Sequence, residues 1–145
     1  MGKKISKIIE EIQSQIQSQI QSQVLDEVVK GSRWLFPDSD SDIRSDCNLG
    51  FSKKPKRPVV VIAINSDNTV WIAPLTTADQ MNKSCTIFCP AGSWKPSNQH
   101  SYMLFNKRIR IKIECFSGDI ANNMGKCINE NILKKIEEKW GKIPQ

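Results

Sequence analysis

The sequence lacks any apolar run long enough to cross a membrane. The longest uninterrupted run is Val59–Ile64, whereas a membrane-spanning helix needs about 20 apolar residues. No basic and apolar leader of the secretory type opens the chain. We therefore expect a cytoplasmic protein without a membrane partner.

Several catalytic signatures are also missing. The chain has no Walker loop, no G-x-G-x-x-G fingerprint and no paired histidines, since His100 is its single histidine. Nucleotide-dependent and Ser-His-Asp chemistry therefore have no support. The 145 residues suit one ordinary domain.

The cysteines form no C-x-x-C pair, and their number is odd. A zinc site needs four ligands at finger-like spacing, so we expect neither a metal nor another cofactor. An odd count without a signal peptide is typical of reduced, buried thiols. The five are Cys47, Cys85, Cys89, Cys115 and Cys127.

Positive charge exceeds negative charge, with 21 Lys and Arg against 15 Asp and Glu and a net charge of +6. Such a balance favours an anionic partner. The excess falls in two short groups, whereas the charges of residues 1–30 cancel. The groups form either a phosphate-binding track or two solvated faces. They comprise Lys53, Lys54, Lys56 and Arg57, and then Lys107, Arg108, Arg110 and Lys112.

A polar segment, residues 38–52, precedes the first basic group and carries Asp38, Asp40, Asp42 and Asp46. Its spacing begins like a calcium-binding EF-hand loop, but the required glycine and bidentate glutamate are absent. We interpret it as a mobile acidic loop that covers the basic groove.

Residues 1–30 read as a separate, Gln-rich amphipathic helix. A Gln-Ser-Gln-Ile repeat fills 13–20, a Gln-Ser-Gln-Val copy follows, and no Pro or Gly interrupts 3–30. A four-residue period moves the apolar stripe by about 40° at each step. The helix therefore either packs obliquely on its own domain or pairs with a second copy or a partner.

Residues 31–145 read as an α+β domain. The β-branched run after Pro58 and the segment Thr69–Leu75 predict a hairpin, and further strands are expected at 34–36, 86–88 and 102–116. Asn129 or Asn131 caps a C-terminal helix. The expected architecture is a small, strongly bent antiparallel sheet or barrel with a long N-terminal and a C-terminal helix.

The sequence supports neither a catalytic triad nor a metal site nor a nucleotide cofactor. Any catalysis at a phosphate must therefore use Arg, Lys, Thr, Ser or Asn side chains. These residues suit metal-free cleavage of RNA, in which the 2′-OH is the nucleophile. Arg stabilises the charge that develops on phosphoryl oxygens, and a hydroxyl orients the substrate.

The central hairpin resembles the MazF/PemK/Kid family of toxin endoribonucleases. The matching residues are Lys56-Arg57-Pro58-Val59-Val60-Val61-Ile62 and Thr69-Val70-Trp71-Ile72-Ala73-Pro74-Leu75-Thr76-Thr77. They are similar to that family's R-P-V-V-V and A-P-[IL]-T strands. Gly31 and Trp34 match its Gly-x-x-Trp entry strand, and the order of elements agrees over residues 31–141.

The resemblance implies an SH3-like barrel and metal-independent cleavage of single-stranded RNA by a homodimer that an antitoxin protein blocks. It assigns Arg57 as the catalytic arginine and Thr76 as its partner at the scissile phosphate. An antiparallel hairpin brings both residues to the same end. We assign RNA binding to Lys53, Lys54, Lys56, Thr77, Lys107, Arg108 and Arg110.

The chain departs from the family pattern at three places. Ser32 and Arg33 stand where the family usually has an acidic residue after the entry glycine. Lys107 stands where relatives often carry an acidic residue just before the strand that bears the later arginine. The N-terminal helix has no counterpart in the compact toxins. The alternative is therefore a non-catalytic barrel that binds nucleic acid or a protein through the same groove.

Overall fold

A hairpin of two long antiparallel strands forms the centre of the sheet. Strand β2 (Lys56–Ile64) and strand β3 (Thr69–Thr76) are joined by a short turn, as the sequence predicted. A continuous β-branched run is typical of a strand that is buried on both faces. Val59 and Val61 indeed lie in one core cluster, whereas Val60 and Ile62 lie in a second cluster on the opposite face.

The protein is described by a computed structural model that covers residues 7–15, 26–39, 45–51, 55–78, 86–95 and 99–141. Five shorter strands, three short 3-10 helices and a C-terminal helix surround the hairpin. The strands are β1 (Arg33–Pro37), β4 (Thr86–Cys89), β5 (Ser101–Leu104), β6 (Ile109–Lys112) and β7 (Asn122–Asn123). The helices are η1 (Ser45–Cys47), η2 (Phe105–Lys107), η3 (Ile113–Phe116) and α2 (Glu130–Gly141).

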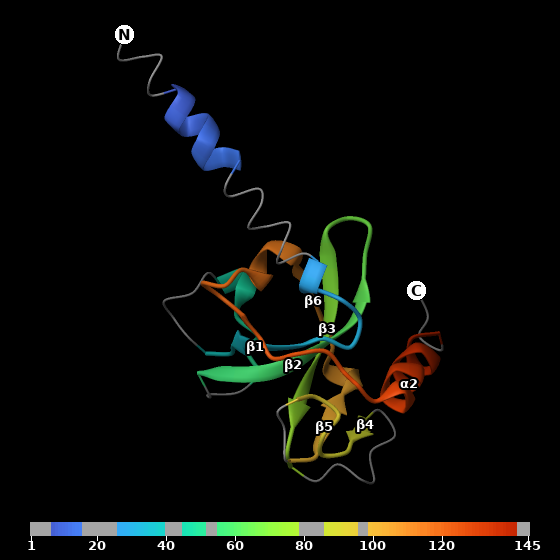
Figure 1. The fold of residues 1–145 in the computed structure, drawn as a ribbon. Coiled ribbons are helices and arrows are strands. Elements are labelled where there is room, and N and C mark those ends of the chain that lie inside the picture. Colours follow the sequence, from blue (N-terminus) through green and yellow to red (C-terminus); the bar gives the residue numbers. More distant parts are fainter. Residues whose placement is uncertain are drawn as a thin grey trace.

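The seven strands form one antiparallel sheet in the order β4-β5-β3-β2-β1-β7, and β6 also pairs with β3 (Figure 1). One edge of β3 is thus shared by β6 and β5, while β2 occupies the other edge. The predicted α+β class is confirmed. Within the described residues the outer strands β4 and β7 do not pair, so the sheet is not closed and the expected barrel is not confirmed.

The prediction of one continuous strand over 102–116 is wrong. Strand β5 pairs Met103 with Leu75, and strand β6 pairs Ile109 with Ile72. From Met103 to Ile109 the chain advances six residues, whereas the paired positions on β3, Leu75 and Ile72, are only three residues apart. The three-residue helix η2 takes up the difference, and a second 3-10 turn, η3, ends β6 after Lys112. Alternating polarity alone does not reveal such a change of partner register.

Large aromatic side chains fill the core on one face of the sheet. Trp34 and Phe36 from β1 meet the ring of Phe116 edge-on, at centroid distances of 5.1 and 4.9 Å. On the other face, helix α2 buries Ile132 and Ile136 against the second cluster. Both faces of the central hairpin are therefore covered.

The segment that leads into β1 is fixed by a glycine. Gly31 adopts a positive φ of +86°, and a Cβ atom at this position would overlap the side chain of Leu133. Its carbonyl accepts hydrogen bonds from the Trp94 indole at 2.8 Å and the Cys127 amide at 3.1 Å. Of the two candidate caps of α2, Asn129 is the one used, because its side chain accepts a hydrogen bond from the Asn131 amide.

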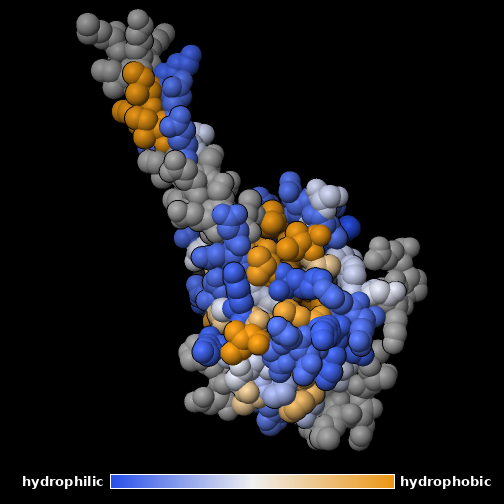
Figure 2. Space-filling view, turned by 45° about the vertical axis from the view of Figure 1, so that its right-hand side comes forward, coloured by the Kyte–Doolittle hydropathy of each residue, from blue (hydrophilic) through white to orange (hydrophobic). Residues whose placement is uncertain are grey.

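The N-terminal segment is helical over residues 7–15 and lies apart from the sheet (Figure 1). Ile8, Ile9 and Ile12 are about half exposed and form an apolar strip beside hydrophilic side chains (Figure 2). Residues 16–25 lie outside the described part, so the expected long helix is not confirmed. No helix in the described ranges is both long enough and apolar enough to cross a membrane.

The expectation that all cysteines are reduced is wrong for one pair. Cys47 of η1 and Cys115 of η3, 68 residues apart in sequence, form a disulfide. It joins the loop after β1 to the turn after β6. Neither residue belongs to a spacing motif, so only the tertiary fold reveals the pair. Cys89 and Cys127 are free thiols, and Cys85 lies outside the described residues.

We predict that Cys47→Ser lowers the free energy of unfolding by about 2–4 kcal/mol, because the disulfide restricts the unfolded chain. Urea unfolding under non-reducing conditions measures the loss, and Cys127→Ser, which removes a free thiol, is the matched control. Recovery of Cys47 and Cys115 as unlinked peptides from the non-reduced native protein would contradict the assignment.

Candidate functional site

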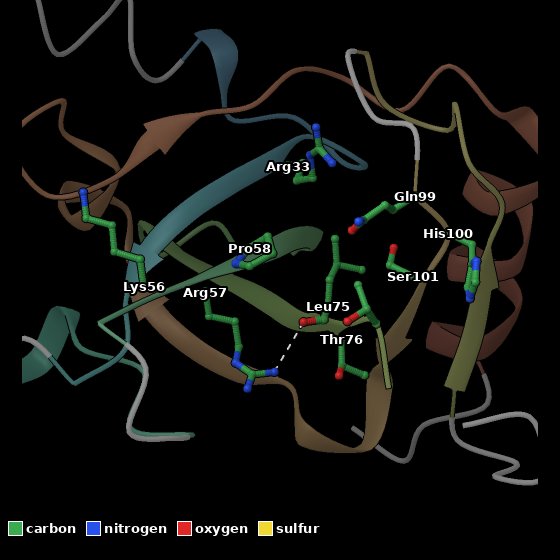
Figure 3. Close-up of a pocket in the computed structure, with 10 residues that line it drawn as sticks. Arg33, Lys56, Arg57, Pro58, Leu75, Thr76, Gln99, His100 and Ser101 are labelled. Carbon is green, nitrogen blue, oxygen red and sulfur yellow. Dashed lines mark hydrogen bonds between the residues drawn. The ribbon is translucent and has the colours of Figure 1, made fainter. Parts of the chain in front are cut away.

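A cavity of about 210 Å³ opens where β2 begins and β3 ends. Its walls come from four segments: Arg33 of β1, residues 56–58 of β2, residues 75–77 at the end of β3, and residues 99–101 before and in β5 (Figure 3). The cavity is open to solvent and is lined by Arg33, Lys56 and Arg57. Lys56 and Arg57 are neighbours on β2, so their side chains project to opposite faces of the sheet. The positive charge of this lining makes an anion the natural ligand.

The pairing of β2 with β3 brings Arg57 and Thr76 together, as the hairpin predicted. Val59 pairs with Pro74, and the same register continued by two residues sets Arg57 opposite Thr76, with both side chains on one face. The Arg57 Nη1 donates a hydrogen bond to the Leu75 carbonyl at 3.3 Å (Figure 3). The guanidinium is thus held at the cavity by the strand that carries Thr76.

The Thr76 hydroxyl is oriented as well. Its oxygen accepts a hydrogen bond from the Ala78 amide at 3.2 Å. Because a hydroxyl has one donor and two acceptor sites, this bond leaves its hydrogen to be donated. The hydroxyl can therefore donate a hydrogen bond to an anion that enters the cavity.

Arg57 forms an ion pair with a buried carboxylate, that of Asp38. The Asp38 side chain is fully buried, and its Oδ2 lies 3.5 Å from the Arg57 Nε. Asp38 is fixed in turn, since its Oδ1 accepts a hydrogen bond from the Phe51 amide at 2.7 Å and its backbone bonds Pro55 and Gly50. A fixed carboxylate orients the guanidinium and neutralises part of its charge.

The interpretation of residues 38–52 as a mobile acidic cover is wrong for Asp38, because this residue is 1% exposed. Asp46 lies 3.7 Å from the Lys112 ammonium, whereas Asp40 and Asp42 lie outside the described residues. The pairing of Asp38 with Arg57 could not be predicted from the sequence, since no local pattern links two residues on separate strands.

A second arginine, Arg33, lines the cavity and was not assigned to the site from the sequence. It is 8% exposed, its Nη2 donates to the Met124 carbonyl at 3.3 Å, and its guanidinium lies over the Trp94 ring at 5.6 Å. Burial lowers the pKa of Arg33 from its usual value, but an arginine side chain stays charged at neutral pH. Arg33 therefore adds a fixed positive charge to the wall.

The predicted RNA-binding residues divide into three sets. Lys56 and Thr77 line the cavity with Arg57, and Lys53 and Lys54 lie outside the described residues. The remaining three do not belong to the cavity wall. Lys107 is exposed on η2, and Arg108 and Arg110 lie over the Trp71 ring at 5.8 and 6.0 Å.

Strand geometry separates Arg110 from the pair of Arg57 and Thr76. Arg110 pairs directly with Trp71, and Trp71 belongs to the face of β3 on which α2 packs. Thr76 is five residues further along β3, so its side chain projects to the opposite face. A single phosphate track that joins Arg57 and Thr76 to Arg110 is therefore not formed.

Residues Gln99, His100 and Ser101 also line the cavity. His100 is the single histidine of the chain, and this made it the one residue of the three that could be singled out from the sequence. Its position near Arg57 could not be predicted, because the two residues are far apart in sequence. Among the described residues, no three His, Cys, Asp or Glu side chains gather as a metal site.

The free thiols do not form a nucleophilic centre. Burial, with a smaller contribution from nearby Cys127, raises the pKa of the Cys89 thiol from about 9 to about 12, and burial raises the pKa of Cys127 as well. The reactive form of cysteine is the thiolate. Both residues are therefore protonated and weakly nucleophilic at neutral pH.

The Asp38–Arg57 pair predicts coupled stability effects. Asp38→Asn is expected to destabilise the fold by about 1–3 kcal/mol, because it leaves buried polar groups poorly partnered. Urea unfolding of Asp38→Asn, Arg57→Gln and the double variant forms a double-mutant cycle. A double variant less destabilised than the sum of the single variants is expected, and strict additivity would contradict the pairing.

The Cys89 thiol predicts a loss of stability at high pH. The unfolded chain ionises this thiol from about pH 9, whereas the folded protein keeps it protonated to about pH 12. Its stabilising contribution is therefore complete below about pH 9 and is lost as the pH rises toward 12. Urea unfolding at pH 8 and at pH 10.5 should show a steeper decline for the wild type than for Cys89→Val, and equal declines would refute the assignment.

Comparison with known proteins does not assign the chain to a family. No protein-family model matches the sequence, and no curated protein matches it significantly.

Proposed function

We propose that the protein is a toxin-like endoribonuclease that cleaves single-stranded RNA by metal-independent transesterification. The observation that carries the proposal is the meeting of Arg57 and Thr76 at one end of the hairpin, at an open cavity that Lys56 and Arg33 also line. A phosphodiester is an anion whose oxygens match guanidinium and hydroxyl donors.

The reaction proceeds at the phosphate between two nucleotides. The 2′-oxygen attacks phosphorus, the bond to the 5′-oxygen breaks, and the products are a 2′,3′-cyclic phosphate and a 5′-hydroxyl. The 2′-OH loses a proton, and the leaving 5′-oxygen gains one. Arg57 stabilises the charge that builds on the non-bridging oxygens, and Thr76 donates a hydrogen bond that positions the phosphate.

The other cavity residues have supporting roles in this proposal. Asp38 is a positioning residue that fixes the orientation of Arg57 through the 3.5 Å ion pair. Lys56 and Thr77 bind flanking phosphates or riboses. His100 is exposed and lines the cavity, so it is available to transfer a proton. It is our candidate for the role that an acidic residue fills in the toxins this chain resembles.

The resemblance of the hairpin to MazF/PemK/Kid toxins extends the proposal. We propose that the bent sheet is a variant of the SH3-like barrel, that the protein acts as a cytoplasmic homodimer, and that an antitoxin protein blocks the cavity. We also propose that the helical segment 7–15 docks against a partner. The exposed strip of Ile8, Ile9 and Ile12 suits such a helix to a partner.

A second candidate function is binding without catalysis. The ion pair with Asp38 favours it, because a neutralised Arg57 gives less stabilisation to a dianionic transition state than a free guanidinium does. In this case the same cavity holds a nucleic acid or a protein partner and breaks no bond.

The decisive test incubates the purified protein with single-stranded RNA in EDTA. We expect cleavage by the wild type and a rate at least about 100-fold lower for Arg57→Ala, because removing one donor to a developing oxyanion costs about that much. Thr76→Val, which removes the hydroxyl at similar volume, should also slow cleavage, and Thr76→Ser should restore it.

Lys134→Ala is the matched control, since it removes an exposed positive charge on α2. Its rate should equal that of the wild type. Cleavage that is unaffected by Arg57→Ala would refute the catalytic assignment. RNA binding that depends on Arg57 without any cleavage would establish the second candidate instead.

A further inference from the structure

A cluster of three rings, formed by Phe88 of β4, Tyr102 of β5 and His100 just before β5, borders the cavity. The Phe88 ring lies 5.3 Å from that of Tyr102 and 5.7 Å from that of His100, and the His100 and Tyr102 rings are 5.9 Å apart. Tyr102 is 5% exposed, whereas Phe88 is 45% exposed and His100 is also exposed. The buried tyrosine thus supports two rings that face solvent.

The pairing register sets this cluster in line with Thr76. Thr76 pairs with Tyr102, and Tyr102 pairs with Phe88, so the three side chains form one row on the same face of the sheet. The neighbouring row consists of Leu75, Met103 and Ile87, and it is buried in the core. The aromatic row is therefore the outer surface of β3, β5 and β4.

The spacing of the row fits a nucleotide. Adjacent strands lie about 4.8 Å apart, so Phe88 is about 10 Å from Thr76 across two strand spacings. Figure 3 shows His100 at the side of the cavity opposite Lys56. A phosphate held by Arg57 and Thr76 would bring a neighbouring base over the rings.

We infer that Phe88 and His100 form a stacking platform for a nucleobase of the RNA strand whose phosphate is bound in the cavity. Single-stranded RNA is commonly bound by stacking its bases on Phe, Tyr, Trp or His. The inference rests on the proposed function, because it takes the phosphate at Arg57 and Thr76 as its starting point. An exposed phenyl ring in line with a cationic cavity matches both parts of a nucleotide.

The test measures binding of the full-length protein to a short, fluorescently labelled 2′-O-methyl oligoribonucleotide of mixed sequence. This probe keeps the phosphates and bases but has no free 2′-hydroxyl, so binding is separated from cleavage. We expect Phe88→Ala to weaken binding by about tenfold, the usual effect of losing one stacked base. The effect should disappear for an oligonucleotide of the same length in which every nucleotide is abasic.

Two further variants isolate stacking from general apolar contact. Phe88→Trp keeps an aromatic face and should bind as the wild type does, whereas Phe88→Leu should bind as weakly as Phe88→Ala. Ile64→Ala removes an exposed apolar side chain at the far end of β2 and is the matched control. Because Phe88 and Ile64 are about half exposed, these variants are expected to fold.

Each negative result has its own meaning. If Phe88→Leu and Phe88→Ala bind as tightly as the wild type while Arg57→Ala binds weakly, the platform is refuted and the proposed function stands. If the wild type neither binds the oligonucleotide nor cleaves RNA in an Arg57-dependent way, both are refuted. In the cleavage assay, Phe88→Ala should raise KM and leave kcat nearly unchanged.

Discussion

The pairing of β2 with β3 is the constraint on which the rest of the structure depends. Its register sends Val59 and Val61 to one core and Val60 and Ile62 to the other. A slip by one residue would exchange the two faces of the strand, moving Arg57 away from Thr76 and disrupting both cores. Stability and the candidate site are therefore specified by the same ladder of hydrogen bonds.

Buried contacts fix the side chains that line the cavity at the end of the β2–β3 pairing. Asp38 is fixed by backbone hydrogen bonds and pairs with Arg57, and the Cys47–Cys115 disulfide anchors the loop that follows Asp38. Arg33 is held by the Met124 carbonyl and the Trp94 ring. These contacts orient the positive charges before any ligand arrives, so an anion meets them with little reorganisation.

The same face of the sheet carries two different surfaces in series. Arg57 and Thr76 offer charge and hydrogen bonds, and the ring cluster of Phe88, His100 and Tyr102 begins one strand further on. A nucleotide has the same sequence of parts, an anionic phosphate followed by a flat apolar base. This correspondence is the physical basis on which we propose a nucleic acid, and not a simple anion, as the ligand.

The sequence by itself determined the α+β class, the central hairpin, the C-terminal helix and the meeting of Arg57 with Thr76. These features depend on local signals: β-branched density, an amphipathic stripe and the geometry of adjacent antiparallel strands. Only the tertiary structure decided that Asp38 is buried beside Arg57, that two cysteines pair, and that β5 and β6 share an edge of β3. It also separated Arg108 and Arg110 from the cavity. These outcomes depend on contacts between residues that are far apart in sequence. They also depend on the face of the sheet to which each side chain projects. Neither can be predicted from spacing along the chain.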